Sequence, residues 1–188
     1  IGRRQRQMCI RDSLMNHINL NNREYDVIIV GAGFSGLYQL ICLRDQLGMN
    51  CLVVETGDDV GGTWYWNRYP GARCDTESHA YSYYFSDELL KEWTWSERYP
   101  GHAEIRRYMN FVADKFDLKK DILFNHKVTS AQYNEDKICW EITTNNKINF
   151  RSKFLITAVG CLSNANIPKI KGLENFKGKY YHLSLIHI

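Results

Sequence analysis

Short apolar runs alternate with a helical pattern along the first third of the chain. Residues 25–30 and 51–54 are rich in β-branched side chains and lack polar alternation, which is typical of strands buried on both faces of a parallel sheet. Between them, leucine and isoleucine recur at helical spacing over residues 37–47, and Gly48 is expected to end the helix. This order predicts an α/β fold, in which helices flank a parallel sheet.

The later part of the chain predicts one more helix and further strands. Residues 103–116 place five apolar side chains on one helical face, and we expect Arg106 and Arg107 to face solvent. Residues 154–158 predict a buried strand that returns the chain to the sheet. Turn residues separate three more strand-like runs, which predict an inserted antiparallel β-meander; the runs are 128–133, 139–144 and 147–150.

The composition is that of one domain with a sizeable core. The chain has 188 residues, of which 44% are hydrophobic. It has no apolar run of membrane-spanning length and no signal-peptide pattern, so we expect a cytoplasmic protein without a membrane partner. The six cysteines are scattered without a C-x-x-C pair. Their spacing argues against a zinc site, a dithiol redox centre or a disulfide framework.

Both ends of the chain resemble translated sequencing adaptor. Residues 183–188 can be encoded by DNA whose opposite strand, in another frame, encodes residues 8–13, so we interpret 1–13 and 183–188 as adaptor-derived. The first segment contains four arginines and one aspartate, and without it the formal net charge of +3 falls to zero. No basic arm then indicates nucleic acid as a partner, and the sequence predicts no protein partner.

A glycine-rich turn joins the first strand to the first helix. Residues 31–36 read Gly-Ala-Gly-Phe-Ser-Gly, the G-x-G-x-x-G pattern in its required place. Gly31 permits the tight turn, Gly33 lets the backbone approach a pyrophosphate, and Gly36 lets helix and strand pack closely. Glu55 follows the second strand, where an acidic residue hydrogen-bonds a ribose diol. A glycine turn with an incidental acid is the alternative; the motif otherwise favours FAD or NAD, because Glu55 would repel the 2′-phosphate of NADP.

Residues 61–75 have the most unusual composition of any stretch. They read Gly-Gly-Thr-Trp-Tyr-Trp-Asn-Arg-Tyr-Pro-Gly-Ala-Arg-Cys-Asp. Large flat side chains are costly to expose to water but can pack against a planar ring system. The sequence Tyr69-Pro70-Gly71 predicts a turn, with proline at the first corner and a positive φ at glycine. From the residues alone, the loop fits either a ligand-binding wall or an aromatic plug of the core.

The same block resembles the signature of flavin-dependent Baeyer–Villiger monooxygenases of the cyclohexanone and phenylacetone monooxygenase type. It matches every fixed position of that pattern, from Gly61 to Asp75. A second family motif is matched by Phe176, Gly178 and His182, while its expected tryptophan is replaced by Ile186. The resemblance implies a truncated two-dinucleotide-domain flavoprotein. Its Rossmann-like FAD-binding domain would span 14–170, and 171–182 would begin the linker to an NADPH domain.

The resemblance also implies an activity and its cofactors. Such an enzyme binds FAD, consumes NADPH and inserts one oxygen of O2 next to the carbonyl of a small-molecule ketone, giving an ester or lactone. The residues assigned by resemblance are Gly31, Gly33, Ser35 and Gly36 for the pyrophosphate; Glu55 for the adenosine ribose; Val128 for the adenine; Thr63, Trp64, Tyr65 and Trp66, preceded by Gly62, for the flavin side; Asp75 and Tyr81 near the flavin ring; and Arg73, Cys74 and Asp75 near the nicotinamide.

Asp75 is the catalytic residue that the resemblance assigns within this chain. In the family, a carboxylate at this position orients an active-site arginine whose cation stabilises anionic charge. That arginine and the NADPH glycine motif are expected beyond His182, so we expect this chain alone to be inactive.

Three other interpretations remain open. One is a flavin monooxygenase that oxygenates nitrogen or sulfur, against which the block from Trp64 to Asp75 argues. Another is a pyridine-nucleotide reductase, although the lack of C-x-x-C makes a disulfide reductase a poor fit. The third is an FAD-binding module without activity.

Overall fold

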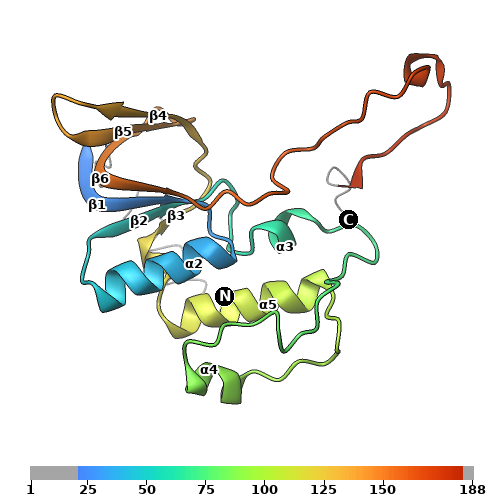
Figure 1. Cartoon of the computed structure of the whole chain (residues 1–188), viewed down its shortest axis with the longest axis horizontal. Coiled ribbons are helices and arrows are strands. Elements are labelled where there is room, and N and C mark those ends of the chain that lie inside the picture. The colour runs from blue at the N-terminus through green and yellow to red at the C-terminus, as the bar shows by residue number, and fades with distance from the viewer. Residues whose placement is uncertain (1–20, 184–188) are drawn as a thin grey trace, which may run out of the picture.

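A six-stranded mixed sheet is the centre of the computed structural model, which describes residues 21–183 (Figure 1). Its strand order is β3-β2-β1-β6-β5-β4. The strands are β1 (Arg23–Val30), β2 (Cys51–Val54), β3 (Ile122–Leu123), β4 (Val128–Asn134), β5 (Cys139–Thr144) and β6 (Asn149–Thr157). Pairing is parallel from β3 to β6 and antiparallel among β6, β5 and β4. The predicted α/β class with an antiparallel unit is therefore confirmed.

Two helical segments cover one face of the sheet. Helix α2 (Phe34–Leu40) continues directly into a π-helix, η1 (Ile41–Gln46), and the chain turns at Gly48, whose φ is +67°. Helix α5 (His102–Lys115) lies on the same side of the sheet (Figure 1). Shorter elements are α3 (Thr63–Trp66), α4 (Asp87–Glu92), and the 3-10 turns η2 (Lys119–Asp121) and η3 (Leu173–Asn175).

The main core lies between the sheet and these helices. Val27 and Ile29 of β1 pack with Leu37 of α2 and with Ile105 and Met109 of α5, and all five are at most 1% exposed. The spacing predicted for residues 103–116 therefore describes the buried face of α5. Burying a large aliphatic side chain contributes about 1.5–3 kcal/mol, so this layer is a major source of stability.

The sequence prediction was wrong about the last strands. It separated the runs 147–150 and 154–158, whereas one continuous strand, β6, includes the end of the first run and most of the second. The polar stretch between them suggested a break, but Ser152 is 2% exposed and pairs with Tyr25 on one side and Trp140 on the other. A central strand hydrogen-bonds through its backbone on both edges, so a polar side chain need not interrupt it.

The antiparallel half of the sheet encloses a second, smaller core. Ile28, Leu52 and Val54 of the parallel strands cluster there with Ile142 of β5 and Phe150 of β6. Burial of the run 154–158 is incomplete, because the side chain of Phe154 is 56% exposed. The expectation that this whole run is buried is therefore wrong at Phe154.

After β6 the chain leaves the body of the molecule as an extended arm, drawn in red-brown in Figure 1. The proposed linker 171–182 falls on this arm. The segments interpreted as adaptor, 1–13 and 183–188, lie outside the described residues except for Leu183. No helix among residues 21–183 is both long and apolar enough to cross a membrane.

Candidate flavin-nucleotide site

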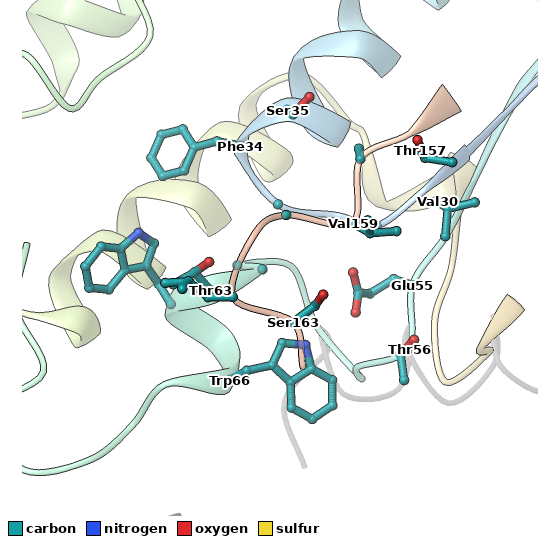
Figure 2. A pocket seen from close by; sticks show the side chains of 18 of the residues that line it. Val30, Phe34, Ser35, Glu55, Thr56, Thr63, Trp66, Thr157, Val159 and Ser163 are labelled. Carbon is teal, nitrogen blue, oxygen red and sulfur yellow. The ribbon is translucent and has the colours of Figure 1, made fainter. Parts of the chain in front are cut away.

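A cavity of about 660 Å³ opens where β1, β2 and β6 end. This is the edge where parallel α/β sheets bind ligands, and the volume lies within the usual range of ligand sites. Figure 2 shows side chains from several segments around it. The lining consists of residues 30–31 and 33–35 around the β1–α2 turn, 54–56 at the end of β2, 61–64 and 66, Tyr81, 127–128 at the start of β4, 157–160 at the end of β6 and 162–164 beyond it.

The glycine-rich turn is packed so tightly that side chains are excluded. Gly31 has φ +104°, and a Cβ there would lie 2.6 Å from the carbonyl oxygen of Ala158. A Cβ at Gly36 would lie 1.9 Å from the carbonyl oxygen of Gly31. No side chain caps the N-terminus of α2. The turn therefore lines the cavity with an uncapped helix N-terminus, the kind of element that binds phosphate in other proteins.

Glu55 connects this turn to the segment after β2. Its carboxylate accepts hydrogen bonds from the backbone N–H of Ala32 (2.6 Å) and of Gly57 (2.7 Å). The residue is 4% exposed, yet it lines the cavity. A carboxylate can accept about four hydrogen bonds, so two backbone donors leave acceptor capacity for a ligand hydroxyl.

The aromatic segment forms a single helical turn, α3, beside the glycine loop. The backbone N–H of Gly61 donates to the Ala32 carbonyl (3.1 Å), and a Cβ at Gly62 would lie 2.8 Å from Cα of Gly33. Two glycines therefore let the two loops touch. The predicted turn at residues 69–72 is present, because Gly71 has φ +77° and the Ala72 N–H donates to the Tyr69 carbonyl (3.0 Å).

The side chains of α3 do not all face the cavity. Thr63, Trp64 and Trp66 line it, whereas Tyr65 does not and is 8% exposed. Successive helical side chains differ in direction by about 100°, so one turn cannot align three consecutive aromatics. This segment therefore does both: Thr63, Trp64 and Trp66 form part of the cavity wall, and Tyr65 is buried away from it.

Tyr81, Trp64 and Phe34 form an aromatic corner of the cavity. The indole N–H of Trp64 donates to the Tyr81 hydroxyl (3.0 Å), and the Phe34 and Tyr81 rings meet edge to face with centroids 4.9 Å apart. Burial raises the pKa of Tyr81, and the nearby Cys74 and Asp75 raise it further, while the Trp64 hydrogen bond opposes this shift. Tyr81 is therefore a neutral phenol at physiological pH.

Arg73, Cys74 and Asp75 do not line the cavity. An isolated β-bridge joins Arg73 to Gly101, and the Cys74 N–H donates to the Pro100 carbonyl (3.0 Å). Arg73 also pairs with Glu97 and with the carbonyl of Tyr99. These contacts hold residues 73 and 74 against residues 97–101, outside the lining of the cavity.

Gly31, Gly33, Ser35, Glu55, Gly62, Tyr81 and Val128 are lining residues that the sequence singled out, whereas Gly36 packs behind the turn. The sequence missed others, because no motif marks them: Thr56, Lys127, Thr157, Leu162, Ser163 and Asn164. The strand predicted over residues 154–158 was the available signal for the last four, because they lie at its carboxyl end or just beyond it. Within residues 21–183, no group of three or more His, Cys, Asp or Glu side chains could hold a metal ion.

Comparison with known proteins agrees with this geometry. A family described as flavin-binding monooxygenase-like matches residues 24–185. The chain is 47% identical over 159 residues to the 2-oxo-Δ3-4,5,5-trimethylcyclopentenylacetyl-CoA monooxygenase of Pseudomonas putida, covering 85% of this chain and 29% of the relative. It is 40% identical over 165 residues to the phenazine N-monooxygenase PhzNO1 of Lysobacter antibioticus, covering 88% of this chain and 30% of that relative.

A solved structure of a related monooxygenase resembles this chain in both fold and sequence. The crystal structure of cyclohexanone monooxygenase from Rhodococcus sp. Phi1 bound to NADP+ superposes with a TM-score of 0.80 at 41% identity, over 87% of this chain and 31% of that one. The chain thus spans about 30% of the length of the proteins it matches. Since the family match covers most of its residues, the chain belongs to the flavin-binding monooxygenase-like family.

Proposed function

We propose that this chain is the FAD-binding part of an NADPH-consuming monooxygenase that inserts one oxygen of O2 beside a ketone carbonyl. The observation that carries the proposal is the glycine turn, which lines a cavity beside the Glu55 carboxylate and leads into a helix whose N-terminus no side chain caps. The family is flavin-binding, and this pairing of phosphate loop and acid suits a dinucleotide such as FAD.

The lining residues fit the parts of FAD in order. The turn from Gly31 to Ser35 would bind the pyrophosphate, and Glu55 would accept a ribose hydroxyl. The backbone at Val128 would meet the adenine. Thr63, Trp64, Trp66 and Tyr81 would contact the isoalloxazine ring through aromatic and polar groups. Bound FAD supplies the redox and oxygen chemistry, while the chain binds it, orients it and excludes water.

Asp75 is proposed to orient a cationic side chain that is not among the described residues. Burial is the main cause of the raised pKa of Tyr81 at the cavity wall, and the nearby Asp75 carboxylate adds to it, which supports a position of Asp75 close to the proposed flavin site. NADPH as hydride donor is supported by the NADP+ bound in the Rhodococcus structure. Arg73 and Cys74 remain proposed contacts of the nicotinamide, although Arg73 is engaged by Glu97 here.

Oxygenation of a nitrogen atom is the second candidate function. The 40% identity to a phenazine N-monooxygenase favours it, whereas two relatives named for ring ketones favour ketone oxidation. Assay of the complete protein with cyclohexanone and with phenazine, followed by mass spectrometry of the products, would separate the two. Formation of a lactone supports the first and formation of an N-oxide supports the second.

FAD binding by the purified chain tests the proposal directly. Gly33 has φ −85°, and a Cβ there would meet only the backbone of Gly62, with its Cα at 3.4 Å and its N at 4.0 Å, so Gly33→Ala should fold while blocking close approach of the pyrophosphate. We expect about a tenfold or greater rise in the Kd for FAD, measured by quenching of flavin fluorescence.

Gly101→Ala is the matched control. A Cβ at Gly101 lies 3.8 Å from its nearest neighbour, outside the cavity, so affinity should be unchanged. A chain that is folded by circular dichroism but does not bind FAD would overturn the proposal. So would equal affinity in the wild type and Gly33→Ala.

A further inference from the structure

Tyr65 lies on the side of α3 away from the cavity, beneath two arginines. The guanidinium carbon of Arg106 is 4.9 Å from the centre of the Tyr65 ring, and that of Arg68 is 5.1 Å away. The Tyr65 hydroxyl donates to the Asp58 carboxylate (2.7 Å). Cations over an aromatic face are attracted by its quadrupole. The ring of Tyr65 is thus restrained at its face and at its hydroxyl.

Arg106 is the better anchored of the two arginines. Its Nη2 donates to Oδ2 of Asp59 (3.1 Å), and Asn110, one turn later on α5, donates to the same oxygen (3.0 Å). Lys119 in turn donates to Oδ1 of Asn110 (2.6 Å). Arg68, by contrast, has a buried Nε without a partner among the described residues. The expected solvated face is confirmed at Arg107, which is exposed, but Arg106 is only 30% exposed and contacts Asp59 and Tyr65.

The ring of Tyr65 has little room to move. A Cβ added at Gly57 would lie 2.8 Å from the ring, and one at Gly61 would lie 2.9 Å from the Tyr65 Cβ. Tyr65 also contacts Trp66 edge to face, with ring centroids 4.8 Å apart and an interplanar angle of 82°. Trp66 is 38% exposed and lines the cavity. A shift of Tyr65 would therefore be transmitted to a cavity-lining ring.

We propose that Arg106 is a positioning residue, which fixes Tyr65 and, through it, the orientation of Trp66 at the flavin end of the cavity. The inference rests on the proposed function for its ligand, FAD. The contacts of Arg106 with Asp59 and Tyr65, which we call the clamp, exist without ligand. A guanidinium suits this role because it is planar, so that it covers an aromatic ring while its fork of N–H groups binds Asp59. Helix α5, which does not line the cavity, would thereby influence flavin binding.

The clamp can be tested without FAD. In the chain labelled with 5-fluorotryptophan, the 19F resonance of Trp66 is identified by its loss in Trp66→Leu. Arg106→Met keeps the aliphatic stem but removes the guanidinium, and we expect the Trp66 resonance to shift or broaden. Arg107→Met, on the adjacent exposed residue of the same helix, should leave it unchanged. An unmoved Trp66 resonance in folded Arg106→Met overturns the clamp, whatever the chain does with FAD.

Flavin binding tests the consequence of the clamp. We expect Arg106→Met to weaken FAD binding about fivefold and to change the visible circular dichroism of the bound flavin. Arg106→Lys should recover part of the affinity, because it keeps the charge opposite Asp59 but not the planar stack.

In a Trp66→Leu background the effect of Arg106→Met should disappear, because coupled residues give non-additive changes. Additive losses would mean that Arg106 does not act through Trp66 and would overturn the proposal. Failure of the wild-type chain to bind FAD contradicts the proposed function and leaves the ligand-free test decisive for the clamp.

Discussion

Glu55 hydrogen-bonds both the glycine-rich turn, at Ala32, and the segment after β2, at Gly57. It was predictable, because the distance from the glycine turn to the acid after the second strand is a property of the motif. Its bonds to Ala32 and Gly57 were not predictable, since they depend on how the turn folds back over β2. Glu55 therefore has a structural role before any ligand binds.

We predict that Glu55→Gln destabilises the chain by about 1–3 kcal/mol, because an amide offers one oxygen acceptor where two buried N–H groups need partners. Urea unfolding followed by circular dichroism measures the loss. Glu135→Gln, at an exposed turn position, is the control and should unfold like the wild type. Equal stability of all three proteins would show that the carboxylate does not hold the loops.

Tyr65 differs from its neighbours in a way that its residue type does not predict. The family resemblance assigned residues 63–66 together to the flavin side, but direction along a helical turn decides which side chains reach the cavity. Thr63, Trp64 and Trp66 line it and Tyr65 does not. The neighbours of Asp75 are likewise set by contacts far along the chain, since Cys74 bonds to Pro100 and Arg73 pairs with Gly101, which no local pattern reveals.

Among the elements, those with a strong local period were predicted well. The strands β1 and β2 and the helix α5 follow from their apolar spacing. The two-residue strand β3 and the short α4 were missed, because so few residues carry no measurable period. The single β6 was divided in two because its polar middle is buried by pairing on both sides, which only the complete sheet provides.

Arg44 connects η1 to the end of α5. Its guanidinium donates to the carbonyl oxygens of Phe116 (2.7 Å) and Asp117 (3.0 Å) and to the Asp121 carboxylate (2.8 Å). These carbonyls lie at the C-terminal end of the helix, where orphan acceptors and the helix dipole both favour a cation. The side chain is 17% exposed, so solvent screens it only in part.

We expect Arg44→Met to lower the free energy of unfolding by about 1–3 kcal/mol, since it leaves helix-end carbonyls without their charged donor. Thermal and urea unfolding measure this change. Arg98→Met removes an exposed arginine paired with Glu77 and should change stability little. If both substitutions have the same small effect, Arg44 is not a cap of α5.

As a whole molecule, the chain corresponds to about 30% of its relatives. Its described residues contain one G-x-G-x-x-G turn, at the cavity that we propose for FAD, and Asp75 is not among the residues that line that cavity. Arg73 and Cys74, the proposed nicotinamide contacts, are held by residues 97–101.

We therefore predict that the chain binds FAD but does not oxidise NADPH. Absorbance at 340 nm should stay constant when NADPH is added to the FAD-loaded chain, with or without cyclohexanone. The complete protein, assayed in parallel, should consume NADPH. Oxidation by the chain faster than by free FAD would contradict this prediction and show that residues 1–188 already contain a working nicotinamide site.

The pairing of β1 with β6 constrains how the protein is made. The partners in this pair are 127 positions apart, from Arg23 with Phe150 to Val30 with Thr157. Pairings this distant form late, because closing a long loop costs entropy before contacts offset it. During synthesis, β1 can join β2 early, but its other side stays open until residue 157 has been translated. Throughout that interval the buried run 27–29 is the edge of an unfinished sheet, and the nascent chain is then most exposed to aggregation.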